Sequence, residues 1–118
     1  MSKKTGFAVV GLGMGRHHCK AISAAPGAQL VAVCDTDEER LNETSIEYSC
    51  KAYTDYQELL SDEEVEVVNI ATPSGMHAKM GIEAASAGKH MIVEKPADIQ
   101  PERVEALITA GRENRVKI

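Results

Sequence analysis

A glycine-rich turn near the amino terminus restricts the fold of this chain more than any other feature. The apolar run at residues 7–10 (FAVV) is followed by three glycines at alternate positions, Gly11, Gly13 and Gly15. The dinucleotide-binding fingerprint is G-x-G-x-x-G between a strand and a helix, with an acidic residue about 20 positions further on. Here the third glycine comes one residue early. The stretch predicts a strand, a tight turn and a helix N-terminus whose free N–H groups can bind a phosphate, although an ordinary glycine-rich turn has the same pattern.

Strand and helix patterns alternate along the rest of the chain. Unalternating apolar runs predict buried strands at 30–34, 65–71 and 90–93, with shorter strands at 52–53 and 116–118. Helical spacing and capping residues predict helices over 14–25, 36–47, 54–60, 76–87 and 101–113. This alternation predicts an α/β fold of the Rossmann type: a doubly wound parallel sheet of about six strands, with helices on both faces and right-handed crossovers.

The helix boundaries and buried faces follow from particular residues. Thr36 is the expected N-cap of the second helix, and residues 54–57 form a second capping box. The expected apolar face of the first helix consists of Met14, His18, Ala21, Ile22 and Ala25. The expected face of the last helix consists of Val104, Leu107, Ile108 and Gly111.

Length and composition limit the class of protein. A chain of 118 residues predicts one domain, and one Phe with no Trp predicts an aliphatic core. The net charge of −5 argues against a nucleic-acid or membrane-surface partner, while local backbone amides can still bind an anionic cofactor. The three cysteines form no C-x-x-C pair, and no secretory signal or membrane-spanning run is present. We therefore expect a cytoplasmic, soluble domain.

Asp35 is the acidic residue that the fingerprint requires. It follows the second predicted strand, 22 positions after Gly13. A carboxylate there can accept both hydroxyls of an adenosine ribose and repels a 2′-phosphate, which favours NAD over NADP. Arg40 on the next helix leaves NADP possible. The simpler alternative is a turn aspartate that caps the next helix.

The residues with the most distinctive chemistry all follow predicted strands. They are the glycine turn, Asp35, the loop at 72–74 (TPS) and the segment 94–96 (EKP). Ligands of open parallel sheets bind beyond the carboxyl ends of the strands. Four such groups at one edge of a sheet therefore predict a dinucleotide site more strongly than any one of them.

Three further groups have two interpretations each. Lys95 can bond a substrate hydroxyl, assist its deprotonation or hold the nicotinamide ribose, or it can form a surface ion pair. His77 either faces the crevice from a helix start or is exposed to water. His17, His18 and Cys19 are adjacent, but successive helix residues point about 100° apart, so no metal site is expected and a packed, hydrogen-bonded His18 is favoured.

Three segments resemble the Gfo/Idh/MocA oxidoreductases, the relatives of glucose–fructose oxidoreductase and inositol dehydrogenase. They are residues 10–22 (VGLGMGRHHCKAI), 70–77 (IATPSGMH) and 94–98 (EKPAD). The T-P-x-x-x-H and E-K-P elements are more specific than the glycines. The shortened glycine turn departs from the usual pattern and leaves open how the loop wraps the pyrophosphate.

The resemblance implies more than the residues alone. It implies an NAD- or NADP-dependent hydride transfer at a hydroxyl-bearing carbon of a sugar, cyclitol or related small molecule, with Lys95 as the catalytic residue. It also implies a second domain that completes the substrate pocket and forms a homo-oligomer. That domain is absent from residues 1–118, so the chain is expected to be a dinucleotide-binding domain that binds NAD(H) weakly and has little or no turnover alone. The cofactor-binding residues expected on both grounds are Gly11, Leu12, Gly13, Met14, Gly15, Asp35, Thr36, Ala71, Thr72, Pro73, Ser74, His77, Glu94 and Lys95.

Two other functions remain open at this point. A free-standing NAD-sensing regulatory module would share the glycine turn and Asp35, but it would have no use for Lys95 beside the nicotinamide. A methyltransferase-like domain that binds S-adenosylmethionine also has a glycine-rich first turn and an acidic residue after its second strand.

Overall fold

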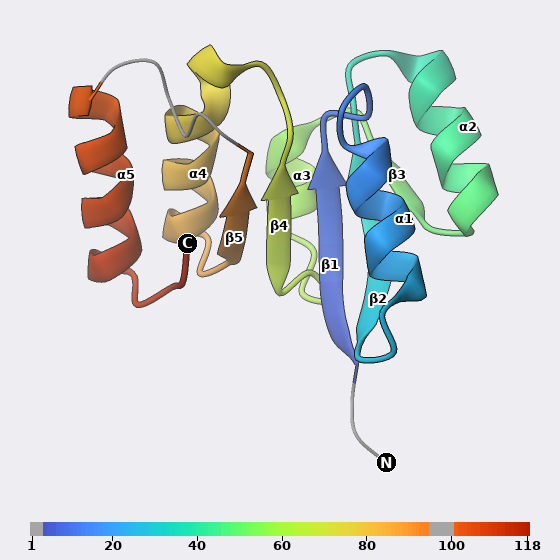
Figure 1. Ribbon diagram of the computed structural model, residues 1–118, viewed down its shortest axis with the longest axis horizontal. Coiled ribbons are helices and arrows are strands. Elements are labelled where there is room, and N and C mark those ends of the chain that lie inside the picture. The colour runs from blue at the N-terminus through green and yellow to red at the C-terminus, as the bar shows by residue number, and fades with distance from the viewer. Residues whose placement is uncertain (1–3, 95–100) are drawn as a thin grey trace.

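The computed structural model describes residues 4–94 and 101–118, and in them strands and helices alternate (Figure 1). The strands are β1 (Thr5–Val10), β2 (Ala28–Cys34), β3 (Lys51–Tyr53), β4 (Val67–Ile70) and β5 (His90–Val93). The helices are α1 (Arg16–Ala24), α2 (Glu38–Tyr48), α3 (Tyr56–Leu60), the short 3-10 helix η1 (Ser74–Met76), α4 (His77–Ser86) and α5 (Pro101–Glu113). The predicted alternation is therefore confirmed.

The strands form one parallel sheet in the order β3-β2-β1-β4-β5. β1 lies at the centre, and the order reverses between β1 and β4, which is the arrangement of a doubly wound Rossmann fold. The sheet has five strands among the described residues, not the expected six. Residues 116–118 run beside β5, where the Met91 N–H donates to the Lys117 carbonyl (2.9 Å), but this one backbone hydrogen bond does not add a sixth strand to the sheet.

Two apolar layers cover the sheet, and both are almost entirely aliphatic, as expected. Successive strand residues point to opposite faces, so Ala8 and Val10 pack with α3, α4 and α5, while Val9 packs with α1 and α2. Figure 1 shows these two groups of helices on either side of the sheet. In the part of the chain that the structure describes, no helix is long and apolar enough to cross a membrane.

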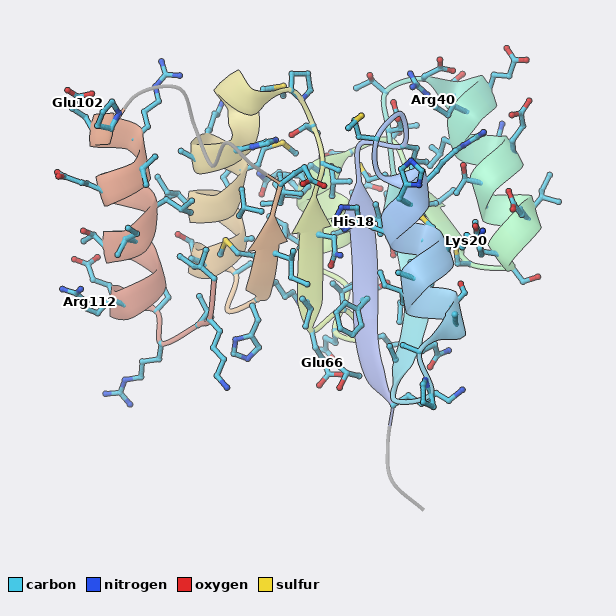
Figure 2. The ribbon with its side chains drawn as sticks, in the orientation of Figure 1. His18, Lys20, Arg40, Glu66, Glu102 and Arg112 are labelled. Carbon is cyan, nitrogen blue, oxygen red and sulfur yellow. The ribbon has the colours of Figure 1, made fainter. Side chains whose placement is uncertain are left out.

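Charged side chains lie at both ends of the sheet and on the helices around it. Figure 2 shows Arg40 at the carboxyl end of the sheet, Glu66 at its amino end, and Glu102 and Arg112 on α5. Charged side chains therefore lie at both ends of the sheet, whereas the glycine turn lies at the carboxyl end.

Two of the predicted helix faces need correction. In α1 the buried residues are Cys19 and Ile22, whereas Met14 is 65% exposed and lies in the turn before the helix. Ala21 and Ala25 are also exposed. In α5 the buried residues are Leu107, Ala110 and Gly111, and Ile108 is exposed. Both faces are rotated because small residues, which carry little hydrophobic signal, pack closest to the neighbouring element.

The predicted capping residues are each one position too early. The N-cap of α2 is Asp37, whose carboxylate accepts from the Arg40 N–H (3.1 Å), and not Thr36. The N-cap of α3 is Asp55, which accepts from the Gln57 N–H (2.9 Å), and not Thr54. In both cases an aspartate directly follows a threonine, and the carboxylate makes a stronger, charge-assisted cap.

A hydrogen-bonded aspartate stabilises the fold away from the carboxyl edge. The Asp62 side chain is only 5% exposed and accepts from Lys51 Nζ (3.0 Å) and the Tyr53 hydroxyl (2.8 Å). It also accepts from the Glu64 N–H (2.9 Å). Burial opposes the charge, but these donors outweigh it and lower the pKa of Asp62 below its ordinary value of 3.8.

We expect Asp62→Asn to lower the free energy of unfolding by about 1–3 kcal/mol at pH 7, because charge-assisted hydrogen bonds in a buried network are lost. A lowered folded-state pKa stabilises the fold above the unfolded-state pKa. The difference between wild type and variant should therefore shrink as the pH falls below about 4. Urea unfolding at pH 7 and pH 3 measures it. Glu64→Gln, which removes the exposed partner of Lys51, is the control and should cost less than about 1 kcal/mol. Equal losses of unfolding free energy in both variants would contradict the stabilising role given to Asp62.

Candidate functional site

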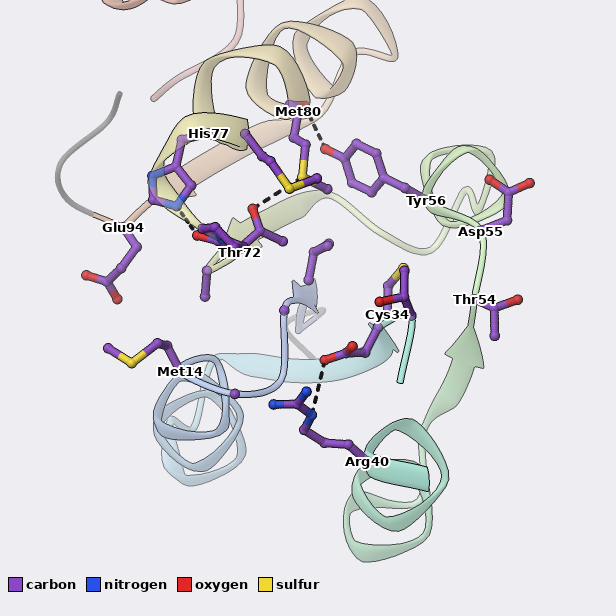
Figure 3. Close-up of a pocket in the computed structure, with 18 residues that line it drawn as sticks. Met14, Cys34, Arg40, Thr54, Asp55, Tyr56, Thr72, His77, Met80 and Glu94 are labelled. Atoms are coloured by element: carbon purple, nitrogen blue, oxygen red, sulfur yellow. Dashed lines mark hydrogen bonds and ion pairs between the residues drawn. The ribbon is translucent and has the colours of Figure 1, made fainter. Parts of the chain in front are cut away.

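A cleft lies beyond the carboxyl ends of the strands (Figure 3). Its volume is about 940 Å³, within the range of small-molecule sites. The candidate residues that line it are Gly11, Gly13, Met14, Asp35, Thr36, Ala71, Thr72, Pro73, His77 and Glu94. Leu12 and Gly15 belong to the same turn but do not line the cleft, because both are buried. Ser74 begins η1, and Lys95 lies outside the described residues.

The glycine turn connects β1 to α1 through two close contacts. Gly11 has φ +89°, which favours glycine, and a Cβ there would lie 2.8 Å from the Ala71 carbonyl and the Thr72 nitrogen. A Cβ on Gly15 would lie 2.1 Å from the Gly11 carbonyl oxygen and 2.7 Å from Val9 Cγ1. The close helix–strand packing that the third glycine of the fingerprint allows is thus made by Gly15, one residue early.

The turn leaves backbone donors at the start of α1. The Gly11 N–H donates to the Cys34 carbonyl (3.0 Å) and the Gly15 N–H to the Gly11 carbonyl (2.9 Å). The N–H groups of Gly13 and Met14 donate to no residue in the described ranges 4–94 and 101–118. Together with the positive end of the α1 dipole, they can bind an anionic group.

Asp35 lies at the end of β2 and is tied to this turn. Its side chain is 10% exposed, and its Oδ2 accepts from the Leu12 N–H (2.8 Å). Its Oδ1 accepts from the Asp37 N–H (2.9 Å). Asp35 therefore steadies the entry to α2, although the N-cap itself is Asp37. A carboxylate offers about four acceptor sites, so Asp35 can still accept hydroxyl groups of a ligand.

Arg40 is a cleft residue that reaches Asp35 from α2 (Figure 3). Its Nε lies 3.6 Å from Asp35 Oδ2, and its Nη2 lies 3.4 Å from Asp37 Oδ2. A Cβ on Gly13 would lie 2.8 Å from Arg40 Nη1, so the guanidinium covers the glycine turn. A cation and a carboxylate thus meet at the end of the cleft nearest β2.

The loop after β4 forms the opposite wall. His77, at the start of α4, is only 2% exposed, so the alternative of a histidine exposed to water is wrong. Its Nε2–H donates to the Thr72 carbonyl, and the Thr72 hydroxyl contacts Met80 Sδ (3.3 Å). Figure 3 shows His77 and Thr72 together across the cleft from Arg40. Through this hydrogen bond, the buried His77 side chain holds the loop after β4 in place.

Glu94 lines the same cleft where β5 ends. Its N–H donates to the Ile70 carbonyl (3.0 Å), and its Oε2 lies 2.7 Å from His18 Nε2. His18 Nδ1 lies 2.9 Å from Asn69 Nδ2. The expected hydrogen-bonded His18 is confirmed. His17 is exposed and Cys19 is buried, so the three neighbouring side chains face different surroundings.

Sequence reasoning missed the part of the cleft that follows β3. Thr54, Asp55 and Tyr56 line it, and the Tyr56 hydroxyl donates to the Met80 carbonyl (2.7 Å). Burial, with help from nearby Glu83 and Cys34, raises the pKa of Tyr56, so the phenol stays neutral. The available signal was position: these residues also follow a strand, yet they were interpreted only as a helix cap.

Cys34, at the end of β2, is a second lining residue that was missed. Burial, followed by the neighbouring charges of Asp35 and Asp55, raises the pKa of the Cys34 thiol to about 12. The thiol is therefore neutral at physiological pH and is a wall of the cleft rather than a nucleophile.

Comparison with protein families gives one match over nearly the whole chain. The model of an oxidoreductase family with an NAD-binding Rossmann fold, GFO_IDH_MocA, matches residues 5–118. UDP-N-acetylglucosamine 3-dehydrogenase of Acidithiobacillus ferrooxidans is 35% identical over 109 residues, which cover 92% of this chain and 34% of that protein. Inositol 2-dehydrogenase of Salmonella typhimurium is 33% identical over 118 residues, covering 97% and 34%.

A solved structure gives the same result. The WlbA dehydrogenase of Bordetella pertussis, in complex with NADH and UDP-GlcNAcA, superposes with a TM-score of 0.93 and 30% identity. The match covers 98% of this chain and 34% of that one. The chain thus spans about a third of the length of the relatives that it matches.

Proposed function

Because the chain belongs to the Gfo/Idh/MocA oxidoreductase family, we propose that it is the NAD(H)-binding unit of a dehydrogenase. The observation that carries the proposal is that one cleft joins the glycine turn, Asp35 and the loop after β4. β2 and β5 are separated by β1 and β4, so Asp35 and Glu94 lie about 14 Å apart along the sheet edge. A long, two-headed ligand suits such a cleft better than a compact one.

The residues that line the cleft indicate which end of the proposed cofactor lies at which end of the cleft. Asp35 accepts the hydroxyls of the adenosine ribose, and the free N–H groups of Gly13 and Met14 bind the pyrophosphate. The nicotinamide riboside lies against Thr72, His77 and Glu94. NAD is preferred to NADP because the buried carboxylate of Asp35 repels a 2′-phosphate.

The proposed reaction is hydride transfer at a hydroxyl-bearing carbon of a sugar, cyclitol or related compound. NAD, when bound, supplies the hydride acceptor. Lys95 follows Glu94 in the sequence and is the proposed catalytic residue, bonding the substrate hydroxyl and assisting its deprotonation. Support for a sugar-like substrate comes from the names of the relatives, which include a UDP-N-acetylglucosamine dehydrogenase and an inositol dehydrogenase.

The proposal extends to the protein around this unit. Residues 1–118 are the dinucleotide-binding domain, and in the whole enzyme a second domain completes the substrate pocket and forms a homo-oligomer. The relatives compared above are all dehydrogenases, which favours an enzyme over a free-standing sensing module. The unpaired cysteines Cys19, Cys34 and Cys50 favour a reducing compartment such as the cytoplasm.

A fluorescence titration tests the cofactor. We expect NADH to bind the chain weakly but saturably, and NAD to displace it, because the backbone and carboxylate contacts are already in place. S-adenosylmethionine should not displace it, and the chain alone should show little or no turnover. Displacement of NADH by S-adenosylmethionine, or the absence of saturable NADH binding, would contradict the proposal.

A further inference from the structure

The side chains of His18, Asn69 and Glu94 form a hydrogen-bonded row that joins three segments of the fold. His18 is in the first turn of α1, Asn69 is on β4, and Glu94 follows β5. The His18 side chain is 17% exposed, and its two ring nitrogens lie 2.9 Å from Asn69 Nδ2 and 2.7 Å from Glu94 Oε2. Figure 2 shows His18 on the side of α1 that faces the sheet. Both ring nitrogens of His18 thus lie within hydrogen-bond distance of sheet residues, Asn69 on β4 and Glu94 after β5.

The direction of these hydrogen bonds follows from the chemistry of the end groups. Asn69 is 3% exposed, and its Nδ2 can only donate, so His18 Nδ1 must accept. The ring proton is therefore on Nε2 and is donated to the Glu94 carboxylate. Asn69 Oδ1 has no hydrogen-bond partner among the described residues. The hydrogen bond from Asn69 Nδ2 to His18 therefore orients this buried amide.

The consequence is a fixed carboxylate at one end of the cleft. The Glu94 N–H is bound to the Ile70 carbonyl (3.0 Å), which fixes its backbone, and His18 fixes its side chain. A free glutamate side chain would lose rotamer entropy when it met a ligand, and a prearranged one does not. His18 itself does not line the cleft.

We propose that His18 is a positioning residue: its Nε2–H holds the Glu94 carboxylate ready to accept a hydrogen bond from the nicotinamide riboside of the bound cofactor. This inference rests on the proposed function, because it takes the end of the cleft at β5 to be the nicotinamide end. Asn69 selects the ring tautomer that makes the donation possible.

Nitrogen-15 NMR of the histidine rings tests the proposal in the wild-type chain. We expect His18 to carry its proton on Nε2 and an unprotonated Nδ1. NADH should shift the His18 Nε2 resonance, whereas ADP, which lacks both the nicotinamide and its ribose, should bind without shifting it. His90, whose Nδ1 accepts from the Lys117 N–H (2.9 Å) outside the cleft, is the internal control and should not move with either ligand.

Two variants separate positioning from a general structural role. A glutamine amide can reach the place of Nε2, so His18→Gln should keep the NADH affinity within about twofold. An asparagine amide reaches only the place of Nδ1, so His18→Asn should weaken NADH about 5- to 10-fold. The affinity for ADP should be unchanged in both variants, because the adenosine end does not depend on Glu94.

Each other outcome overturns something specific. If both ligands bind and the His18 resonance responds to neither or equally to both, His18 does not position Glu94, and the cofactor site stands. Protons on both ring nitrogens, or parallel losses of NADH and ADP affinity in His18→Asn, also overturn the positioning role. If neither ligand binds the wild-type chain, the proposed function fails and this inference fails with it.

Discussion

Gly15→Ala is expected to destabilise the fold by about 3 kcal/mol and to weaken NADH binding at least ~100-fold. The added Cβ would lie 2.1 Å from the Gly11 carbonyl oxygen, which is backbone and cannot rotate away. It would also lie 2.7 Å from Val9 Cγ1 in the central strand. Relief therefore requires α1 to move away from β1, and the Gly13 and Met14 N–H groups would move with it.

Urea unfolding and an NADH titration measure the two effects of Gly15→Ala. Gly27→Ala is the matched control, because a Cβ on Gly27 meets no atom within 4 Å. It should change the free energy of unfolding by no more than about 0.5 kcal/mol. A Gly15→Ala variant with the unfolding midpoint and NADH affinity of the control would contradict the role given to this glycine.

Asp35→Asn is expected to change the ratio of NADH to NADPH affinity by about 100-fold in favour of NADPH. The amide keeps an oxygen that can accept from the Leu12 N–H but removes the charge that strengthens bonds to ribose hydroxyls. It also removes the repulsion of a 2′-phosphate, while Arg40, whose Nε is 3.6 Å from the carboxylate, stays in place as a cation.

Titrations with both reduced cofactors measure the change in preference. Asp37→Asn removes the same charge two residues away, outside the cleft lining, and should leave the ratio unchanged. The double variant Asp35→Asn/Arg40→Ala should lose the NADPH affinity that the single variant gains. An unchanged ratio in Asp35→Asn would show that the carboxylate does not face the adenosine ribose.

The order of the elements could be predicted because each carries its own local signal. The apolar run at 30–34 became most of β2, and the helix over 101–113 was placed without error as α5. The caps could not be placed to the residue, since Thr36 and Asp37 both satisfy the pattern and only the backbone geometry chooses between them. Residues 116–118 look like a strand, yet pairing depends on a neighbour that no local pattern reveals.

The candidate site was predictable where it follows from strand ends and not where it depends on side-chain reach. Asp35 and Thr72 were found because topology brings the carboxyl ends of parallel strands together. Tyr56 enters the cleft from the short helix α3, and Met80 enters it from α4. Their direction depends on how each helix rests on the sheet, which periodicity alone does not give.

The contact of Gly11 with Ala71 has a mechanical consequence. The turn after β1 lies against the first residues after β4, with room for no more than a hydrogen atom between them. Because packed backbone of this kind yields little, we expect these two segments to move together rather than independently. A substitution that displaces the turn after β1 should therefore also displace the first residues after β4.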